Sequence, residues 1–251
     1  MTGRRERQRE ATYAEIVSTS RGLLAEGAEL SLRAVAQRMG MTAPALYRYV
    51  ASYQELVDLV AFEIDRAATE TFVMAADRHR ADDPAARLVA SAVAFRRWAL
   101  GNPREFGLVF ANPIADTACV RRDLLTSATS GHFMNGLLVE VWQRTGFPYP
   151  ALAELPAAVR ASVEDPLIPM DASVIEPADR GVLWVFMQAW QALYGVVTLE
   201  VFGHMDPRII ESGAMFVQMV HEWIPRLGLG ADADRLKGLL GEELARADSG
   251  S

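Results

Sequence analysis

The stretch SLRAVAQRMGMTAPALYRYV, residues 31–50, contains two short helical patterns separated by a corner of only a few residues. Ser31 is a favourable N-cap residue for the first helix, whose apolar positions recur at helical spacing. Gly40 follows where a helix can end in the left-handed conformation that glycine adopts at least cost. Thr42 is placed to cap the second helix, and Pro44 lies in its first turn, where a missing N–H does no harm. This pattern predicts a helix-turn-helix.

The second helix of this motif has two different faces. Leu46 and Val50 are expected to point inward, whereas the outer face is small at its leading end and polar or aromatic beyond it. Such a helix can enter the major groove of DNA, which is about 12 Å wide. Two helices joined at a glycine corner also occur in proteins that never bind nucleic acid, so the flanking sequence has to decide. The residues assigned to the outer face are Ala43, Pro44, Ala45, Tyr47, Arg48 and Tyr49.

Both flanks of the motif favour DNA binding. Upstream lies a basic N-terminal arm, which is suited to phosphates or to a minor groove. About residues 12–26 then form the first predicted helix. Downstream, the run from Ser52 to Glu55 has the capping-box pattern, so a long fourth helix is predicted to begin directly after the motif. The basic arm consists of Arg4, Arg5, Arg7 and Arg9.

This region resembles the DNA-binding domain of the TetR family of bacterial transcriptional regulators. The similarity covers about residues 12–60 and includes the run LYRYV, residues 46–50, which is the most specific part of that family's signature. The resemblance implies an all-α homodimer with an N-terminal three-helix helix-turn-helix DNA-binding domain, residues 1–55, and a C-terminal helical effector and dimerisation domain, residues 56–251. The family usually has a phosphate-binding lysine where Tyr53 stands, so one positive charge per subunit is missing here.

The resemblance and the major-groove interpretation together predict how the motif contacts DNA. Phosphate contacts position a protein on DNA, whereas contacts with base edges specify the sequence. Pro44 and Ala45 offer apolar contact to thymine methyl groups. Tyr53 is expected to donate a hydrogen bond to phosphate in place of the lysine. The other predicted phosphate contacts are Arg33, Thr42 and Tyr47, and the predicted base contacts are Ala43, Pro44, Ala45 and Arg48.

The distribution of charge fits a DNA-binding head attached to an acidic body. The chain has 251 residues, of which 51% are hydrophobic and 23% charged, so it can bury a sizeable core. Its net charge is −7, but eight Arg and five Glu give the first 50 residues a charge of +3, which leaves −10 on the rest. The single Cys119 excludes an intrachain disulfide and suits a reducing cytoplasm. No basic-then-apolar leader opens the chain.

The region after the fourth helix reads as further helices broken by Pro and Gly, with no alternating strand pattern. A proline-rich segment, residues 145–177, is predicted to be an irregular linker with one short helix. The chain is expected to end in a frayed polar tail. The predicted helices are Pro84–Leu100, Arg104–Phe110, Ala118–Arg144, Ala178–Gly203 and Pro207–Leu227.

One of these helices is long and apolar enough to suggest a membrane span. Gly181–Leu199 contains no charged residue over 19 positions. Gln188, Gln191 and Thr198 interrupt its apolar surface, however, and it stands alone. A helix that is apolar nearly all round also results when one face packs on its own core and the other on a partner subunit. We therefore expect the last two long helices to form a homodimer interface rather than a membrane anchor.

Two segments of the C-terminal region resemble a branch of the TetR family whose effector domains carry a Trp-x-x-x-His-Gly signature. They are FRRWALGNP, residues 95–103, and WQALYGVVTLE, residues 190–200, in which Tyr194 takes the place of the histidine. The implied partner is a small apolar or amphipathic molecule in a mostly apolar cavity. An ordinary core position is the alternative for each candidate. From the helices that surround the pocket in that family, the predicted ligand-binding residues are Trp98, Phe110, Phe133 and Tyr194.

Enzymatic motifs are absent from the sequence. It contains no nucleophile elbow, no phosphate-binding P-loop and no His-Glu-x-x-His helix. The four His residues lack the spacing of metal ligands, so neither a metal nor a cofactor is expected. An enzyme is the alternative class, and turnover of a substrate without DNA would support it. The predicted function is a DNA-binding repressor, which binds a palindromic operator as a dimer and is released by a small ligand.

Overall fold

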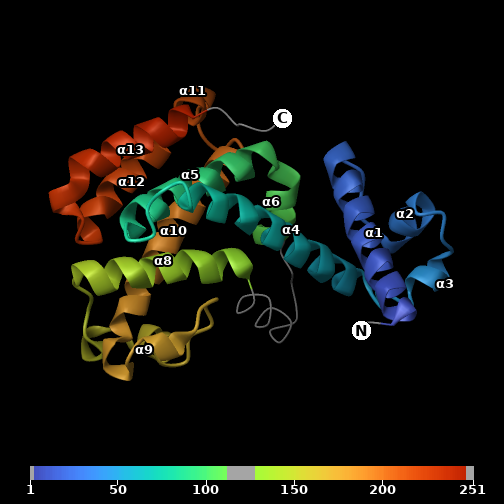
Figure 1. Ribbon diagram of the computed structural model, residues 1–251, viewed down its shortest axis with the longest axis horizontal. Coiled ribbons are helices and arrows are strands. Elements are labelled where there is room, and N and C mark those ends of the chain that lie inside the picture. The colour runs from blue at the N-terminus through green and yellow to red at the C-terminus, as the bar shows by residue number, and fades with distance from the viewer. Residues whose placement is uncertain (1–2, 112–127, 247–251) are drawn as a thin grey trace. The chain divides into compact units, whose positions relative to one another are not determined.

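In the computed structural model, residues 3–111 and 128–246 are described, and every regular element among them is a helix (Figure 1). The prediction of an all-α fold is confirmed. In chain order the α-helices are α1 (Arg4–Glu26), α2 (Leu32–Arg38), α3 (Ala43–Leu46), α4 (Tyr53–Ala76), α5 (Pro84–Gly101), α6 (Pro103–Phe110), α8 (Thr129–Thr145), α9 (Ala157–Glu164), α10 (Gly181–Val201), α11 (Pro207–Ser212), α12 (Ala214–Arg226) and α13 (Ala233–Ala245). Short 3-10 helices are η1 (Leu152–Glu154), η2 (Ala172–Val174), η3 (Pro177–Asp179) and η4 (Gly230–Asp232).

The helices pack as two compact units. The first unit holds the described residues of Met1–Ala67 and Asn102–Thr117, and the second holds those of Ala68–Gly101 and Ala118–Ser251. α4 is continuous and supplies residues to both units. α6 belongs to the first unit, although α5 before it and α8 after it belong to the second. The boundary predicted between residues 55 and 56 stays a prediction.

α1 begins at Arg4, well before the predicted start near Thr12. The basic N-terminal segment is therefore helical, and its prediction as a separate arm is wrong. This segment consists mainly of Arg, Glu and Gln, which favour helix formation, and the Thr12 hydroxyl donates to the carbonyl of Gln8 one turn earlier, at 3.0 Å. Further along α1, Ile16 and Leu23 are buried, as expected from the apolar pattern.

α2 and α3 form the predicted helix-turn-helix. Ser31 Oγ accepts a backbone N–H of α2 at 3.2 Å, which confirms this N-cap. At the corner Gly40 has a φ of +66°, in the region that favours glycine. Thr42 occupies the N-cap position of α3, but its hydroxyl accepts no N–H of that helix, so this detail of the prediction is wrong. Pro44 has no N–H to donate, and the N–H of Ala45 donates to the backbone carbonyl of Thr42 instead, at 2.9 Å.

Buried anchors and a capping box hold the residues that follow α3. Leu46 and Val50 are 0% and 1% exposed, which confirms that both point inward. Ser52 Oγ accepts the N–H of Glu55 at 3.1 Å, while the Glu55 carboxylate accepts the N–H of Ala51 at 2.6 Å. α4 therefore starts at Tyr53, three residues after the last anchor, as the capping-box pattern predicts.

α6 packs on α1 within the first unit. Arg21 donates twice to the carboxylate of Glu105, from Nε at 2.6 Å and from one terminal nitrogen at 3.1 Å. Next to it, Arg104 donates to the carbonyls of Leu24 and Ala25 at 3.1 and 2.7 Å. These carbonyls belong to the last turn of α1, where few backbone N–H groups are left to bind them, although that of Leu24 also accepts the N–H of Gly27 at 3.0 Å. The end of α1 is thus completed by a helix that lies far away in the sequence.

In the second unit, α5 and α8 pack against each other. α5 begins at Pro84 as predicted. α8 begins at Thr129, because Ala128 has a non-helical ψ of 116°. The prediction of one helix running from Ala118 is therefore wrong at this point, and residues 118–127 lie outside the described residues.

The proline-rich segment between α8 and α10 is folded into the core. It contains one α-helix, α9, as predicted, together with η1, η2 and η3. Phe147, Leu155, Val163 and Ile175 in this segment are at most 5% exposed. They join buried side chains of α8 and α10 in one hydrophobic cluster. The description of this segment as a mere linker is therefore wrong.

The last part of the chain differs most from its prediction. The predicted helix Pro207–Leu227 is interrupted at Gly213, whose φ of +64° separates α11 from α12. After it, the expected polar tail contains α13, which packs on α5. Leu236 and Leu240 on α13 are buried. Arg97 on α5 also donates to a carbonyl of α13 at 2.7 Å.

Candidate DNA-binding and effector-binding sites

The recognition segment, defined here as residues 42–49, presents most of its side chains to solvent. Tyr47 is 52% exposed, and Arg48 is exposed beside it. At the leading end Thr42, Ala43 and Pro44 are exposed, while Ala45 is half-buried. The arrangement gives one apolar, narrow end and one polar, aromatic end on the same short element.

Two further candidate residues lie on the helices beside this segment. Arg33 on α2 is exposed and forms no ion pair with any described residue, so its charge is available to an external anion. By contrast, Arg38 on the same helix donates twice to Glu26, at 2.6 and 2.8 Å, and this hydrogen bond holds the pKa of Glu26 below its usual range. Tyr53 opens α4 and is 52% exposed.

Tyr49 has a partner that the sequence pattern does not indicate. This residue was assigned to the outer face, but it is half-buried against Tyr13 of α1, with ring centroids 5.7 Å apart and ring planes at 86°. The Tyr13 hydroxyl donates to the Tyr49 carbonyl at 3.1 Å, and it accepts a hydrogen bond from Arg9, also at 3.1 Å. The sequence held one signal, the position of Tyr13 on the apolar side of α1, but nothing in it pointed to Tyr49.

In the second unit, Trp98 and Tyr194 are connected through a chain of aromatic rings. Trp98 stands edge-on to Phe72 at 6.1 Å, and Phe72 stands edge-on to Phe95 at 5.7 Å. Phe95 is 5.7 Å from Trp190, which stacks on Tyr194 at 5.6 Å. These are distances at which aromatic pairs attract one another. Two of the four predicted ligand-binding residues thus belong to one cluster.

The other two predicted ligand-binding residues lie elsewhere. Phe110 belongs to the first unit, where its ring is 5.3 Å from that of Phe106. Phe133 on α8 is half-buried and forms no ring–ring contact with the described residues. The assignment of all four residues to a ligand site stays a prediction.

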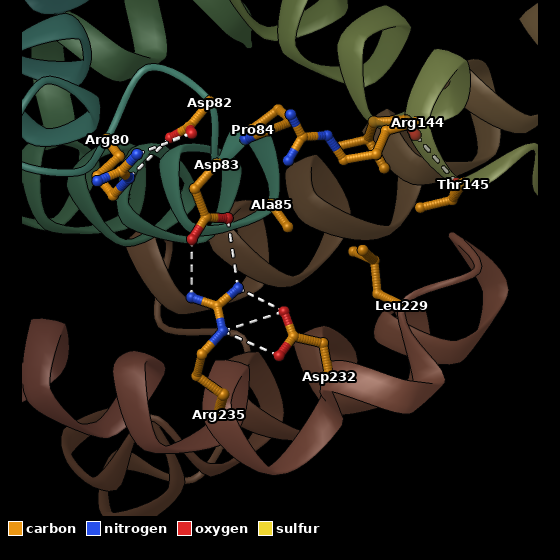
Figure 2. Close-up of a pocket in the computed structure, with 11 residues that line it drawn as sticks. Arg80, Asp82, Asp83, Pro84, Ala85, Arg144, Thr145, Leu229, Asp232 and Arg235 are labelled. Carbon is orange, nitrogen blue, oxygen red and sulfur yellow. Dashed lines mark hydrogen bonds and ion pairs between the residues drawn. The ribbon is translucent and has the colours of Figure 1, made fainter.

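The second unit also contains a cavity of about 350 Å³, which is lined by none of these aromatic residues (Figure 2). It lies where the turn before α5, the end of α8 and the start of α13 meet. Six of its eleven lining residues are charged, which does not suit a purely apolar ligand. The lining residues are Arg80, Asp82, Asp83, Pro84, Ala85, Val141, Arg144, Thr145, Leu229, Asp232 and Arg235.

Ion pairs around this cavity connect helix ends. Figure 2 shows Arg235 between two carboxylates, donating to Asp83 at 2.8 and 3.3 Å and to Asp232 at 2.9 Å. The hydrogen bond from Arg235 holds the pKa of Asp232 below its usual range. Asp83 also accepts the N–H of Ala86 at 3.0 Å, which caps α5. The pairs therefore have a structural role in holding α13 to α5. Among the described residues, no group of His, Cys, Asp and Glu could hold a metal ion.

α10 is the one described helix that is long and apolar enough to cross a membrane, with a mean hydropathy of 1.4 over its best window. Val182, Leu183 and Phe186 on this helix are at most 1% exposed within the chain's own core. Part of this helix therefore packs in the hydrophobic core of the second unit.

Comparison with known proteins agrees with this architecture. A model of the family described as "Tetracyclin repressor-like, C-terminal domain" matches residues 88–223, more than half of the chain. The chain is 29% identical over 226 residues to the HTH-type transcriptional regulators Mb1846 of Mycobacterium bovis and Rv1816 of Mycobacterium tuberculosis, which covers 85% of this chain and 91% of each relative. The crystal structure of SCO4313, described as a regulatory protein, has the same fold with a TM-score of 0.54 at 23% identity, covering 98% of this chain and 100% of that one.

A helix-turn-helix on an all-helical body defines a DNA-binding regulator of transcription. The chain belongs to the tetracyclin repressor-like, or TetR, family. Regulators of this family are soluble DNA-binding proteins and not enzymes. The resemblance found in residues 12–60 is therefore confirmed at the level of the family.

Proposed function

We propose that this TetR-family regulator is a cytoplasmic repressor, which binds a palindromic operator as a homodimer and is released by a small apolar or amphipathic ligand. The observation that carries the proposal is the recognition segment. Its residues Pro44, Tyr47 and Arg48 face solvent, while Leu46 and Val50 anchor it in the core. An exposed helix that is held firmly by buried anchors is the element that reads a major groove in this class of motif.

The exposed side chains divide naturally into two kinds of contact. Thr42, Tyr47 and Arg33 carry hydrogen-bond donors and are suited to phosphates, as is the Tyr53 hydroxyl at the start of α4. The Arg48 guanidinium is suited to base edges, where it can donate two parallel hydrogen bonds to guanine. The remaining base contacts come from Ala43, Pro44 and Ala45, which offer apolar contact to thymine methyl groups.

A footprint on the DNA upstream of the protein's own gene tests this proposal. We expect protection of a palindrome, with an affinity that falls steeply as the salt concentration rises, because phosphate contacts release counterions. A control duplex of the same length with scrambled sequence should bind more weakly. Absence of a protected palindrome together with salt-independent binding would rule out the DNA-binding proposal.

A second copy of the chain is the partner that the exposed apolar surface of the second unit suits best. Only 33% of the most apolar window of α10 is buried in the single chain. Large exposed apolar patches are rare on soluble monomers, and pairing with the same surface of a second copy would bury them by two-fold symmetry. Two heads about 34–36 Å apart then read a palindrome. The exposed apolar residues of α10 to α12 and the turn after α10 are Trp190, Leu199, Phe202, Ile209 and Met215.

Not every apolar residue of the last two predicted helices faces outward. Phe216, Val220 and Trp223 on α12 are at most 8% exposed and belong to the chain's own core. Met219 packs against the same core. The interface that we propose therefore consists mainly of the outer face of α10 and of Ile209 and Met215.

The effector site that we propose includes the aromatic residues Trp98, Phe133 and Tyr194 of the second unit, whereas Phe110 belongs to the first. Its support is the chain of rings that connects Trp98 to Tyr194, since apolar and aromatic walls are typical of small-molecule sites. A ligand releases the protein from DNA only if it binds the DNA-incompetent state more tightly. α4, which contributes to both units, is the element suited to carry that difference. We also propose that the chain belongs to the branch of the TetR family with the Trp-x-x-x-His-Gly signature, in which Tyr194 takes the place of the histidine.

Deletion of the gene distinguishes a repressor from an activator. We expect transcription of the genes next to the operator to rise when the regulator is absent, and to fall again when it is supplied on a plasmid. A fall on deletion would overturn the repressor role while leaving DNA binding intact.

A further inference from the structure

Arg9 is held beside the recognition segment by two hydrogen bonds in series. Its guanidinium donates to the Tyr13 hydroxyl at 3.1 Å, and that hydroxyl donates to the backbone carbonyl of Tyr49 at 3.1 Å. The edge-on packing of Tyr13 on Tyr49, at 5.7 Å, fixes the ring that carries this hydroxyl. A residue that the sequence placed on a separate arm is thus attached, through α1, to the end of the element that reads DNA.

The charge of Arg9 is not neutralised within the described part of the chain. Arg9 forms no ion pair there, and even Glu6, one turn earlier on α1, does not pair with it. A guanidinium has five N–H donors, of which Tyr13 occupies one. The central carbon of the guanidinium, Cζ, lies over the Tyr13 ring at 5.5 Å from the ring centroid, and this contact restrains the side chain without removing its charge. Donors therefore remain for an external anion.

We propose that Arg9 contacts a DNA phosphate beside the groove that the recognition segment enters, and that Tyr13 is its positioning residue. The proposal rests on the DNA-binding function proposed above. An arginine that is already restrained loses less side-chain freedom when it forms hydrogen bonds to phosphate. The same Tyr13 hydroxyl is bound to the Tyr49 carbonyl, so Arg9 keeps a fixed position relative to the recognition segment. The contact is to the DNA backbone and carries no sequence preference of its own.

The salt dependence of DNA binding tests the contact of Arg9. The probes are the duplex protected in the footprint and a random-sequence duplex of the same length. We expect Arg9→Ala to reduce the slope of log affinity against log salt concentration by about two in a dimer, one phosphate per subunit, on both duplexes. The control is Arg38→Ala, which removes the same charge from α2, where Glu26 holds the side chain. This control should keep the wild-type slope, and equal slopes for Arg9→Ala and wild type would overturn the proposal.

A double-mutant cycle tests whether Tyr13 acts through Arg9. Tyr13→Phe keeps the ring against Tyr49 and removes only the hydroxyl. We expect it to weaken binding of both duplexes by a larger factor when Arg9 is present than in the Arg9→Ala background, where only the hydrogen bond to Tyr49 is lost. If Tyr13 merely supports the fold, Tyr13→Phe will weaken binding by the same factor in both backgrounds, and the positioning role is then overturned. Arg9→Lys, which keeps the charge but not the planar fork, should keep the wild-type salt slope with reduced affinity.

The two proposals fail in different ways. If the wild-type protein binds neither duplex, the DNA-binding function fails and this contact fails with it. If the wild type binds with a steep salt dependence and Arg9→Ala does the same, only the contact of Arg9 is overturned. Thermal unfolding of each variant shows that a changed slope does not arise from loss of fold.

Discussion

Glu200 on α10 accepts a hydrogen bond of 2.6 Å from Nε of Arg96 on α5, and its side chain is fully buried. The same guanidinium donates to the carbonyl of Ile210 at 2.9 Å, so Arg96 connects α5 to both α10 and α11. The second carboxylate oxygen of Glu200, Oε1, accepts no hydrogen bond from the described residues. Burial therefore raises the pKa of Glu200 above its usual range, although Arg96 opposes the rise.

This raised pKa predicts how stability changes with pH. The folded state holds the proton of Glu200 more tightly than the unfolded chain does. The stability that this group provides is therefore complete below the unfolded pKa, about 4.3 for Glu, and is lost as the pH rises through the folded value. We expect Glu200→Gln to gain stability relative to wild type as the pH rises from about 4 towards neutrality. Urea unfolding at a series of pH values, at one protein concentration, measures the difference.

Glu243 provides the matched control for this prediction. It too is fully buried, and burial acts to raise its pKa, but hydrogen bonding to Arg78 and the nearby charge of Arg246 lower the pKa overall. Its contribution to stability should therefore be lost as the pH falls, so the difference between wild type and Glu243→Gln runs in the opposite direction. Parallel pH profiles for the two variants would contradict this account.

Two glycines of α1 predict changes of opposite sign. Gly27 has a φ of +76°, and a Cβ there would lie 2.5 Å from a guanidinium nitrogen of Arg104. We expect Gly27→Ala to lower the free energy of unfolding by about 1–2 kcal/mol, because an L-residue is strained in the left-handed region. Gly22 lies inside the helix with open space around it, so Gly22→Ala should raise the same quantity by about 0.5–1 kcal/mol. Urea denaturation at a fixed protein concentration measures the free energy of unfolding of each variant. Changes of the same sign for Gly27→Ala and Gly22→Ala would be inconsistent with the structure.

The recognition segment predicts two different defects in DNA binding. Tyr47→Ala should weaken binding to all sequences, because its proposed contact is with phosphate. Arg48→Ala should relax the preference at one or two positions per half-site, by about 1–3 kcal/mol each. Binding of single-base variants of the operator, followed by fluorescence anisotropy, separates the two effects. Arg38→Ala serves as a control, since Arg38 is held by Glu26. Uniform weakening by Arg48→Ala would exclude it from base reading.

The proposed dimer predicts which apolar positions cannot accept a charge without loss of the interface. Leu199 is 41% exposed in the single chain, so Leu199→Glu should give a folded monomer that has lost operator binding. Val196→Glu, at a half-buried position of the same helix, should act in the same direction. Met219→Glu tests the chain's own core instead, because Met219 packs there. Met74→Glu on α4, at a position that is 61% exposed, is the control. Sedimentation measures the mass, and a monomeric wild type at micromolar concentration would refute the dimer.

The proposed effector site predicts variants that bind DNA but do not respond to ligand. Trp98→Ala and Phe133→Ala should keep operator affinity and blunt release of the operator by an inducing ligand. Trp142→Ala is a matched loss of an aromatic ring, since Trp142 packs edge-on to Tyr149 at 5.8 Å outside the chain of rings. It should lower stability without changing the response. Titration of the operator complex with ligand provides the measurement, and unchanged affinity in the presence of every ligand shown to bind would exclude this mechanism.

The helix-turn-helix could be predicted at the level of single residues because its signals are local. Ser31 caps a neighbouring N–H, Gly40 takes a positive φ, and Ser52 and Glu55 form a capping box within one turn. Each signal depends only on residues a few positions apart in the chain. The apolar spacing of Leu46 and Val50 then predicts which side is buried.

Features that depend on distant partners could not be predicted in this way. α13 looks like a polar tail in isolation, since its stability comes from Leu236 and Leu240 packing in the second unit. Tyr13 reads as one more apolar position until the structure places Tyr49 against it. The aromatic residues of the effector region are also ambiguous, because a pocket wall and a core have the same composition.

The contact between Arg104 and the end of α1 has a consequence for the construction of chimaeric regulators. A fragment cut after residue 55 would leave α6 behind, and with it the donors to the carbonyls of Leu24 and Ala25 and the carboxylate that Arg21 binds. The carbonyl of Ala25 would then have to bind water, whereas that of Leu24 would keep only the N–H of Gly27. A reading head transplanted onto another effector domain should therefore carry Pro103–Phe110 with it, or the recipient must supply an equivalent arginine at the same place.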